Sequence, residues 1–249
     1  MWNDVVDLRD FYRSNLGPNA ESLIGQRIRQ IWDNTSQQRI LGLGYATPYL
    51  SLFEEESERV IAAMPARQGV LHWPVEGTGK VTLCEEAEIP LPDVSVDRVL
   101  MVHALECSEQ LRPMLREVWR VLADGGRLIA VVPNRRGIWA RMDRTPFGHG
   151  YPYTPAQLNR LLRDTLFTPI QTERALYMPP SQSRVMLASS RAWEEVGSRL
   201  FPTFSGVLIV EAGKQIYAAS ADSAKAPRRR RYTAPVPGAH RSNQETTPG

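Results

Sequence analysis

Residues 97–134 read DRVLMVHALECSEQLRPMLREVWRVLADGGRLIAVVPN, and they indicate a strand, a helix and a second strand in succession. The apolar run at 97–102 has the length of a buried strand, and apolar residues at helical spacing follow through Trp119. Gly125 and Gly126 then turn the chain into the apolar stretch 127–133. Two buried strands joined by a helix are typical of a right-handed crossover in a parallel sheet.

The same alternation continues on both sides of this unit. Short apolar strands are predicted upstream at 39–43, 59–63 and 80–84, with a helix that starts at Thr47-Pro48 and runs to residue 57. Downstream, a helix opens at Thr154-Pro155, and strands at 169–177 and 206–211 enclose a helix at 188–200. We therefore predict an α/β fold, a doubly wound Rossmann-like sheet of about seven strands. The sheet is expected to be mostly parallel, with an antiparallel edge strand and helices on both faces.

Three segments are expected along the chain. Residues 4–32 show helical spacing interrupted at Gly17-Pro18, which predicts N-terminal helices within 1–36. The α/β domain then covers 37–219. Residues 220–249 are rich in Pro, Ser, Ala and Arg and contain almost no large aliphatic residue, which predicts a disordered basic tail.

Composition excludes several classes of protein. The chain has 249 residues, of which 42% are hydrophobic and 23% charged, and no apolar run approaches the length of a membrane span. Acidic residues near the start argue against export, so we expect a cytoplasmic protein without a membrane partner. The two cysteines are too few for a disulfide framework: Cys84 falls on an apolar strand, and Cys107 has no histidine at a diagnostic spacing. Four histidines without ligand spacing predict no metal site.

The net charge of +3 is distributed unevenly. The tail holds six basic residues against two acidic ones, so the rest of the chain is close to neutral. We therefore expect no nucleic-acid partner, except one bound through the arginine run at 228–231. The other interpretation of that run is a solubilising tail.

The first strand-to-helix bend, residues 42–48 (GLGYATP), is where an open α/β sheet would bind a ligand. Its small residues would let a ligand approach the main chain, and the free amides of the next helix would face polar groups. A simple turn is the alternative. The bend fits neither a dinucleotide fingerprint nor a phosphate-binding loop, because Thr47 replaces the third small residue and no Gly-Lys-Ser/Thr follows.

Three segments resemble one family. ILGLGYATP at 40–48, EEAEIPLPDVSVDRVL at 85–100 and RVLADGGRLIAVVPN at 120–134 are similar to the motifs of class I S-adenosylmethionine-dependent methyltransferases, in particular the methyltransferase type 11 group. The resemblance spans roughly 38–165 and implies S-adenosylmethionine as cofactor and methyl transfer as the reaction. The acceptor is expected to be a small molecule, and a protein partner is a further expectation.

The chain departs from the family pattern at its acids. Gly42 stands where the first strand usually ends in a carboxylate, Tyr45 replaces a cysteine, and Ala46 and Pro48 replace glycines. After the second strand, Met64-Pro65 replaces the acid that normally takes the ribose hydroxyls. The alternative function is therefore a catalytically inactive methyltransferase-like protein with a binding or regulatory role.

The resemblance also implies roles for residues after the third and fourth strands. Glu85 and Glu86 would lie near the adenine amino group, although solvated loop positions are the alternative. His103 and Glu106 follow the fourth strand, and His103 is the candidate general base, with a packed histidine as the alternative. Asp97 opens that strand at the end away from the site, so it is expected to be structural. The predicted cofactor contacts are Gly42, Gly44, Tyr45, Ala46, Glu85, Glu86 and His103.

A long loop at 134–153 follows the fifth strand, and loops of this length in compact domains are usually functional or mobile. Arginines there could bind an anionic acceptor through bidentate hydrogen bonds. The alternative is a surface lid held by ordinary salt bridges. The predicted acceptor contacts are Asn134, Arg135, Arg136, His149 and Tyr151.

Overall fold

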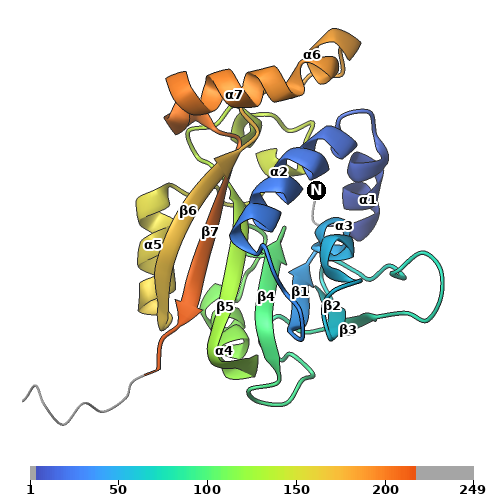
Figure 1. Cartoon of the computed structure of the whole chain (residues 1–249), viewed down its shortest axis with the longest axis vertical. Helices are drawn as coiled ribbons and strands as arrows, with labels where there is room; N and C mark the ends of the chain where they lie inside the picture. The colour runs from blue at the N-terminus through green and yellow to red at the C-terminus, as the bar shows by residue number, and fades with distance from the viewer. Residues whose placement is uncertain (1–3, 217–249) are drawn as a thin grey trace, which may run out of the picture. The chain divides into compact units, whose positions relative to one another are not determined.

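The computed structural model describes residues 4–216, which form one sheet with helices on both faces (Figure 1). The strands are β1 (Arg39–Gly44), β2 (Arg59–Pro65), β3 (Val81–Cys84), β4 (Val96–Val102), β5 (Leu122–Pro133), β6 (Phe167–Ala175) and β7 (Val207–Lys214). The helices are α1 (Val5–Arg13), α2 (Gly17–Ile31), α3 (Thr47–Leu50), α4 (Leu111–Val121), α5 (Pro155–Asp164), α6 (Arg184–Ala188) and α7 (Ser190–Leu200). The predicted tail at 220–249 lies outside the described residues, and the predicted division at residue 36 stays a prediction.

The strand order is β3-β2-β1-β4-β5-β7-β6, which confirms the predicted doubly wound sheet. Strands β1 to β5 pair in parallel, whereas β7 is antiparallel to both β5 and β6. The final two strands are therefore neighbours, with β7 inside the sheet and β6 at its edge. The chain order reverses between β1 and β4, so the carboxyl ends of these two strands mark the switch point at which such sheets bind ligands.

Alternate side chains of the strands form two hydrophobic layers. On one face, Leu100 and Ile129 pack in the layer that contains the buried residues of α1, α2 and α3. On the other face, Val99 and Leu128 pack in the layer that contains the buried residues of α4 and α5. This alternation follows from the two-residue period of a strand. In Figure 1, α6 and α7 lie across the end of the sheet where β6 finishes and β7 begins.

Two helix starts follow the expected capping chemistry. The α1 helix begins after Asp4, whose carboxylate accepts from the amide of Val6 at 2.7 Å. The α5 helix begins after Thr154, as predicted, with a reciprocal capping box between Thr154 and Gln157. Both caps satisfy amides that a helix N-terminus leaves without partners.

The helix predicted from Thr47 to residue 57 is shorter than expected. It ends at Leu50 and continues only as a 3₁₀ turn, η1 (Ser51–Phe53). The chain then turns so that the Glu56 carboxylate accepts from both terminal nitrogens of Arg29, at 2.8 and 2.6 Å, and from the amide of Thr35 at 2.6 Å. These bonds lower the pKa of Glu56 to about 2. A charged group held by several donors outweighs the modest helix propensity of the acidic run.

Asp97 has the structural role expected of it. Its carboxylate accepts from the Arg39 amide at 2.9 Å and from the Arg39 guanidinium at 2.9 and 3.1 Å. The Arg39 side chain lowers the pKa of Asp97. The contact ties the amino ends of β1 and β4 together, away from the switch point.

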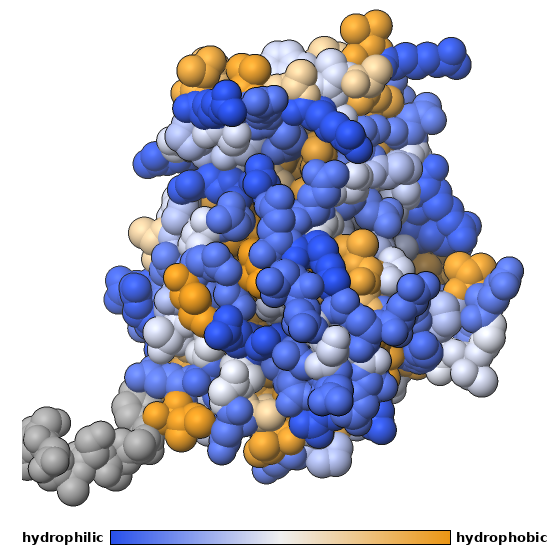
Figure 2. Space-filling model, viewed as in Figure 1, coloured by the Kyte–Doolittle hydropathy of each residue, from blue (hydrophilic) through white to orange (hydrophobic). Residues whose placement is uncertain are grey.

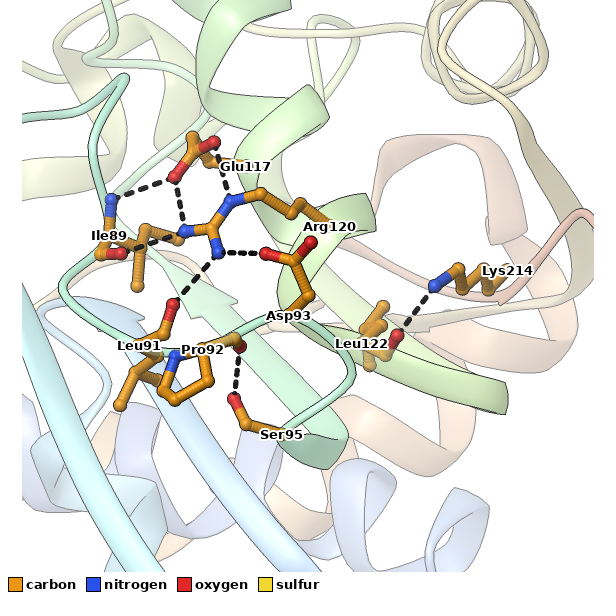
Figure 3. A network of polar contacts seen from close by, with 9 residues as sticks. All are labelled: Ile89, Leu91, Pro92, Asp93, Ser95, Glu117, Arg120, Leu122 and Lys214. Carbon is orange, nitrogen blue, oxygen red and sulfur yellow. Dashed lines mark hydrogen bonds and ion pairs between the residues drawn. The ribbon is translucent and has the colours of Figure 1, made fainter.

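Arg120 on α4 holds the segment that leads from β3 to β4 (Figure 3). Its guanidinium donates to the carbonyls of Leu91 at 2.8 Å and Ile89 at 2.9 Å, and pairs with Asp93 at 2.6 Å and Glu117 at 2.7 Å. Glu117 in turn accepts from the Ile89 amide at 3.0 Å. Main-chain groups of a loop are thereby satisfied by one fixed side chain.

We expect Arg120→Gln to lower the free energy of unfolding by about 1–3 kcal/mol, because it removes the donor from the partly buried Leu91 carbonyl and leaves Glu117 with the Ile89 amide as its donor. Chemical denaturation of the two proteins measures the difference. Arg116→Gln, an exposed arginine on the same helix, is the matched control and should change stability by less than about 0.5 kcal/mol. Equal effects of the two variants would contradict the role given to Arg120.

No helix among residues 4–216 is long and apolar enough to cross a membrane.

Candidate functional site

A cavity of about 460 Å³ opens at the carboxyl ends of β2, β3 and β4. Pro65 ends β2, Glu86 follows β3, and His103 and Ala104 follow β4. Because β1 lies between β2 and β4 in the sheet, the cavity reaches the switch point. We call it the switch-point cavity; it is lined by Asp4, Pro65, Arg67, Gln68, Glu86, His103, Ala104, Cys107 and Glu109.

Carboxylates outnumber cations around this cavity. Asp4, Glu86 and Glu109 line it, against the single guanidinium of Arg67. Arg67 and Glu109 form an ion pair, but both side chains are more than 60% exposed, so the pair is weak. The cavity is therefore suited to a ligand that carries positive charge.

Glu86, rather than its neighbour Glu85, belongs to the cavity. The Glu86 side chain is buried, and one carboxylate oxygen accepts from the Ser108 hydroxyl at 2.6 Å and from the Gln110 amide at 3.0 Å. Glu85 is exposed. Of the two glutamates predicted to approach a cofactor, only Glu86 is thus held in position by the fold.

His103 is the most constrained residue of the site. Its backbone adopts φ +51°, a left-handed conformation that is uncommon for a residue other than glycine. Its side chain is buried, with Nε2 at 3.0 Å from the Tyr12 hydroxyl and Nδ1 at 3.2 Å from Glu106. Its carbonyl accepts from the Gln68 side-chain amide at 2.9 Å. Both ring nitrogens are therefore bonded within the protein.

Tyr12 brings α1 onto this histidine. The Tyr12 hydroxyl lies 2.9 Å from the Tyr49 hydroxyl, and its ring packs against those of Tyr45 and Phe11. Burial raises the pKa of Tyr12 well above its ordinary value. The phenol is thus neutral at any physiological pH and acts as a hydrogen-bonding cover over His103.

Two buried oxygens beside His103 have no hydrogen-bond partner within residues 4–216, namely Oε1 of Gln68 and Oε2 of Glu106. Buried polar atoms are normally paired, so each exception calls for an explanation. Each belongs to a side chain that bonds His103 through its other polar atom. The region therefore retains acceptor capacity for a donor that the protein itself does not supply.

The bend after β1 faces protein rather than open space. A Cβ at Gly42 would lie 2.6 Å from the Leu50 side chain, and one at Gly44 would lie 2.4 Å from the Val102 carbonyl. The amide of Tyr45 donates to that same carbonyl at 2.8 Å, and the Tyr45 and Ala46 side chains are buried. The glycines thus permit close packing of β1 against α3 and β4, and their predicted contact with a cofactor stays a prediction.

A second cavity of about 480 Å³ lies on the α1 side of this bend and is bordered by Tyr45, Tyr12 and Met64. Its charged groups include Arg9 and Arg13, with Glu21 as the carboxylate. A third hollow, of about 770 Å³, lies between α2 and α3 and contains no strand residue. For a cationic ligand, charge favours the switch-point cavity over the second cavity, and position at the strand ends favours it over the third hollow.

The predicted acceptor residues separate into two groups. The Asn134 side chain is buried and donates to the carbonyls of Thr203 and Ser205, at 3.0 and 2.9 Å, so the fold uses it to hold two loops together. Arg135 and Arg136 are exposed.

In contrast, the Tyr151 amide donates to the Glu106 carbonyl at 2.8 Å, which places the 149–151 part of the loop beside the cluster around His103. The Nε2 atom of His149 lies 2.8 Å from the Asp143 carbonyl oxygen.

Both cysteines are free thiols. Cys84 is buried, as predicted for a core residue, and burial raises its pKa to about 11. Cys107 lines the switch-point cavity, and burial also raises its pKa. Neither thiol is activated as a nucleophile.

Sequence reasoning missed Gln68 and Tyr12. Tyr12 belonged to the apolar pattern of the first helix, which gave no reason to place it over the end of β4. Gln68 follows β2 in the sequence MPARQG, where only the loss of an acid stood out. A polar residue just after a strand that ends at the switch point was the available signal.

Comparisons with known proteins agree with this fold. A family model described as a methyltransferase domain matches residues 41–130. A SAM-dependent methyltransferase from Thermotoga maritima has a similar structure, with a TM-score of 0.58 at 16% identity over 85% of this chain and 96% of that one. So does a chain from the complex between the Haloferax volcanii Trm112 methyltransferase activator and a methyltransferase, with a TM-score of 0.60 at 14% identity over 84% and 98%.

The [4+2]-cyclase SpnF is also similar, with a TM-score of 0.52 at 14% identity over 77% of this chain and 82% of that one. No curated protein sequence matches the chain. S-adenosylmethionine is the cofactor that the family match implies. Its sulfonium and ammonium groups fit the carboxylates of the switch-point cavity and the unpartnered side-chain oxygen of Gln68.

We predict that Gly44→Ala destabilises the protein at least twice as much as Gly125→Ala. Both glycines have positive φ, +79° and +75°, so both variants incur a conformational cost of roughly 1–2 kcal/mol. Only the Cβ at position 44 meets backbone, whereas nothing lies within 4 Å of one at 125. Thermal and urea denaturation measure the two costs. Equal costs would mean that β1 and β4 do not approach each other as described.

We also predict that Tyr12→Phe lowers the free energy of unfolding by about 1–3 kcal/mol, since it removes a shared partner from buried His103 and Tyr49. Tyr151→Phe is the control, because that side chain is 73% exposed. Urea denaturation of both variants is the measurement. A Tyr12→Phe protein as stable as the control would show that the hydroxyl does not bond His103.

Proposed function

We propose that this chain, which has the fold and the family motifs of class I S-adenosylmethionine-dependent methyltransferases, transfers a methyl group from that cofactor to a small molecule. The observation that carries the proposal is the acidic switch-point cavity, which combines three carboxylates with Gln68, whose side-chain oxygen is unpartnered, at the ligand-binding edge of the sheet. The family match supports the same cofactor.

Two side chains of the cavity would hold the cofactor. Glu86 is fixed by Ser108 and Gln110, and a carboxylate held in this way can accept from an amino group without reorganising. Gln68 is fixed to the His103 carbonyl through its nitrogen, which leaves its oxygen as an acceptor. When bound, S-adenosylmethionine supplies an activated methyl group that requires alignment and exclusion of water more than a strong base.

The acceptor would approach from the 149–151 part of the loop after β5. This segment contacts Glu106, the residue that orients His103. His149 and Tyr151 are therefore better placed than Arg135 and Arg136 to border an acceptor, while Asn134 serves the fold. His103 as general base requires that the Tyr12 hydroxyl leave Nε2, because that nitrogen is occupied in the described structure.

A cytoplasmic location and a protein partner are further parts of the proposal; a similar methyltransferase chain occurs in the complex with the Trm112 activator.

A second candidate is a methyltransferase-like protein that binds a ligand without transferring a group. The packed bend at Gly44 and the cover of Tyr12 over His103 favour it. The similarity to the [4+2]-cyclase SpnF is consistent with a fold that does not by itself fix the reaction.

Calorimetric titration with S-adenosylmethionine and with its demethylated product tests the proposal. We expect saturable binding at micromolar ligand, weakened at least tenfold in Glu86→Gln because one carboxylate is removed from the cavity. Glu85→Gln is the matched control, since it removes the same charge from the exposed neighbour and should change affinity less than about twofold. Circular dichroism must show that both variants are folded, because Glu86 also accepts from Ser108 and Gln110.

Labelling of Cys107 by a maleimide locates the ligand independently of its affinity. In a Cys84→Ala protein, Cys107 is the sole remaining thiol, and a ligand in the switch-point cavity should slow its modification. No heat at millimolar ligand would reject cofactor binding. Tight binding with full labelling of Cys107 would place the cofactor elsewhere, and binding without transfer to any acceptor in a metabolite screen with a labelled methyl donor would favour the second candidate.

A further inference from the structure

The end of the molecule beyond β5, β6 and β7 carries a surface that the proposed function does not use. It consists of residues 134–148, from the loop after β5, and the insert at 179–205, which we call together the carboxyl-end surface. Residues 149–151, which the proposed function places beside the acceptor, are not part of it. The two segments are joined by hydrogen bonds from Asn134 to Thr203 and Ser205. Just before the insert, the Met178 carbonyl accepts from the Trp139 indole at 2.7 Å. The surface is therefore a single packed unit.

Large apolar side chains of this surface face solvent. Along α7, Trp193, Val196 and Leu200 recur at helical spacing, while Ser190, Glu194 and Gly197 on a different side of the helix are buried. Leu200 is 67% exposed, and Val185 on α6 is 77% exposed. Hydrophobic groups are visible along the upper edge of the molecule, over α6 and α7, with hydrophilic ones beside them (Figure 2). The exposed apolar residues of the surface are Ile138, Val185, Trp193, Val196, Leu200, Phe201 and Phe204.

The same surface is rich in arginine. It holds seven arginines against three acidic residues, although the described chain as a whole is close to neutral. Of the acids, Glu194 is buried and accepts from the Tyr177 amide at 2.9 Å, and burial raises its pKa. Glu195 pairs with Arg199 at 3.1 Å. The arginines are Arg135, Arg136, Arg141, Arg144, Arg184, Arg191 and Arg199.

We propose that the carboxyl-end surface docks on an anionic phospholipid bilayer. Exposed Trp, Phe and Leu beside arginines are the combination that lets a helix lie in the membrane interface, with apolar groups among the acyl chains and guanidinium groups at the headgroups. Charge complementarity supports this occupant, because an anionic leaflet attracts clustered arginines. A nucleic acid would use the arginines but not the aliphatic Val185, Val196 and Leu200, which have no ring to stack on a base.

The proposed contact is peripheral: the protein lies on the bilayer and no segment spans it. A search of the sequence for membrane-spanning segments does not detect such a contact. Sequence reasoning predicted no membrane partner because no apolar run is long enough to span a bilayer. The surface is assembled instead from two segments that are more than 25 residues apart in the chain. Each segment alone is too short and too polar to indicate contact with a membrane. The inference does not depend on the proposed methyl transfer.

Sedimentation of the full chain with vesicles tests the proposal. Vesicles that contain phosphatidylglycerol should bind the protein, and vesicles of phosphatidylcholine alone should bind it at least tenfold more weakly. The double variant Leu200→Ser/Phe201→Ser should reduce binding to the anionic vesicles about tenfold, because two exposed apolar side chains are lost. Val75→Ser is the control, since Val75 is 81% exposed and lies outside the surface.

The arginine run at 228–231 could also attract anionic vesicles, so each measurement is repeated with those four arginines replaced by glutamine. Binding should persist in that background and remain sensitive to Leu200→Ser/Phe201→Ser. Binding that vanishes with the arginine run, or that is equal in the variant and the control, overturns the proposal. So does a change from dimer to monomer in the double variant without an effect on vesicle binding, which would make the surface a contact between copies. Preferential binding of an RNA oligonucleotide would likewise reject the bilayer.

Discussion

The site depends on how the chain holds His103 at the end of β4. A left-handed backbone at this position is unfavourable for a histidine, yet three side chains from separate segments bond it: Tyr12 from α1, Gln68 from the turn after β2, and Glu106 from the following turn. Each bond crosses a boundary between elements, so the histidine locks the N-terminal helix, the second strand and the switch point together. Strain of this kind persists only where the surroundings over-determine it.

These bonds limit what His103 can do as a base. A histidine with both ring nitrogens bonded internally cannot take a proton from an acceptor until one bond opens, and the Tyr12 bond is the one carried by a terminal helix. Release of α1 would uncover Nε2 without disturbing the Glu106 bond that orients the ring. Transfer to an acceptor that needs no base would instead proceed with α1 in place. Methyl transfer to an acceptor that must lose a proton therefore requires release of α1, whereas transfer to an acceptor that loses none does not.

The sequence predicted the sheet well because its signals are local. Apolar runs such as 127–133 and the Thr154-Pro155 start depend on neighbours in the chain, and the structure confirms a strand and a helix at these places. The predicted turn at Gly125 and Gly126 is wrong, because β5 already begins at Leu122 and includes both glycines. The site was predicted only in part. Glu86 lines the cavity while its contact with a cofactor stays a prediction, and the bend at Gly44 is packed against β4. Gln68 and Tyr12 meet His103 across 35 and 91 residues, and no local pattern encodes such contacts.

The family motif places acids after β1 and β2, and this chain lacks them. Their loss does not by itself prevent binding of a cationic cofactor. Attraction between a cavity and a cation depends on the sum of nearby charges, not on one conserved place in the chain. Here Asp4 comes from the segment before α1, Glu86 from the end of β3 and Glu109 from the turn after β4, so three separate elements supply carboxylates to one cavity. The negative charge that a cationic ligand needs is thus supplied by residues that lie outside the missing motif positions. What the chain gives up is the fixed ribose contact, so we expect such a site to hold its ligand more by charge than by hydroxyl recognition.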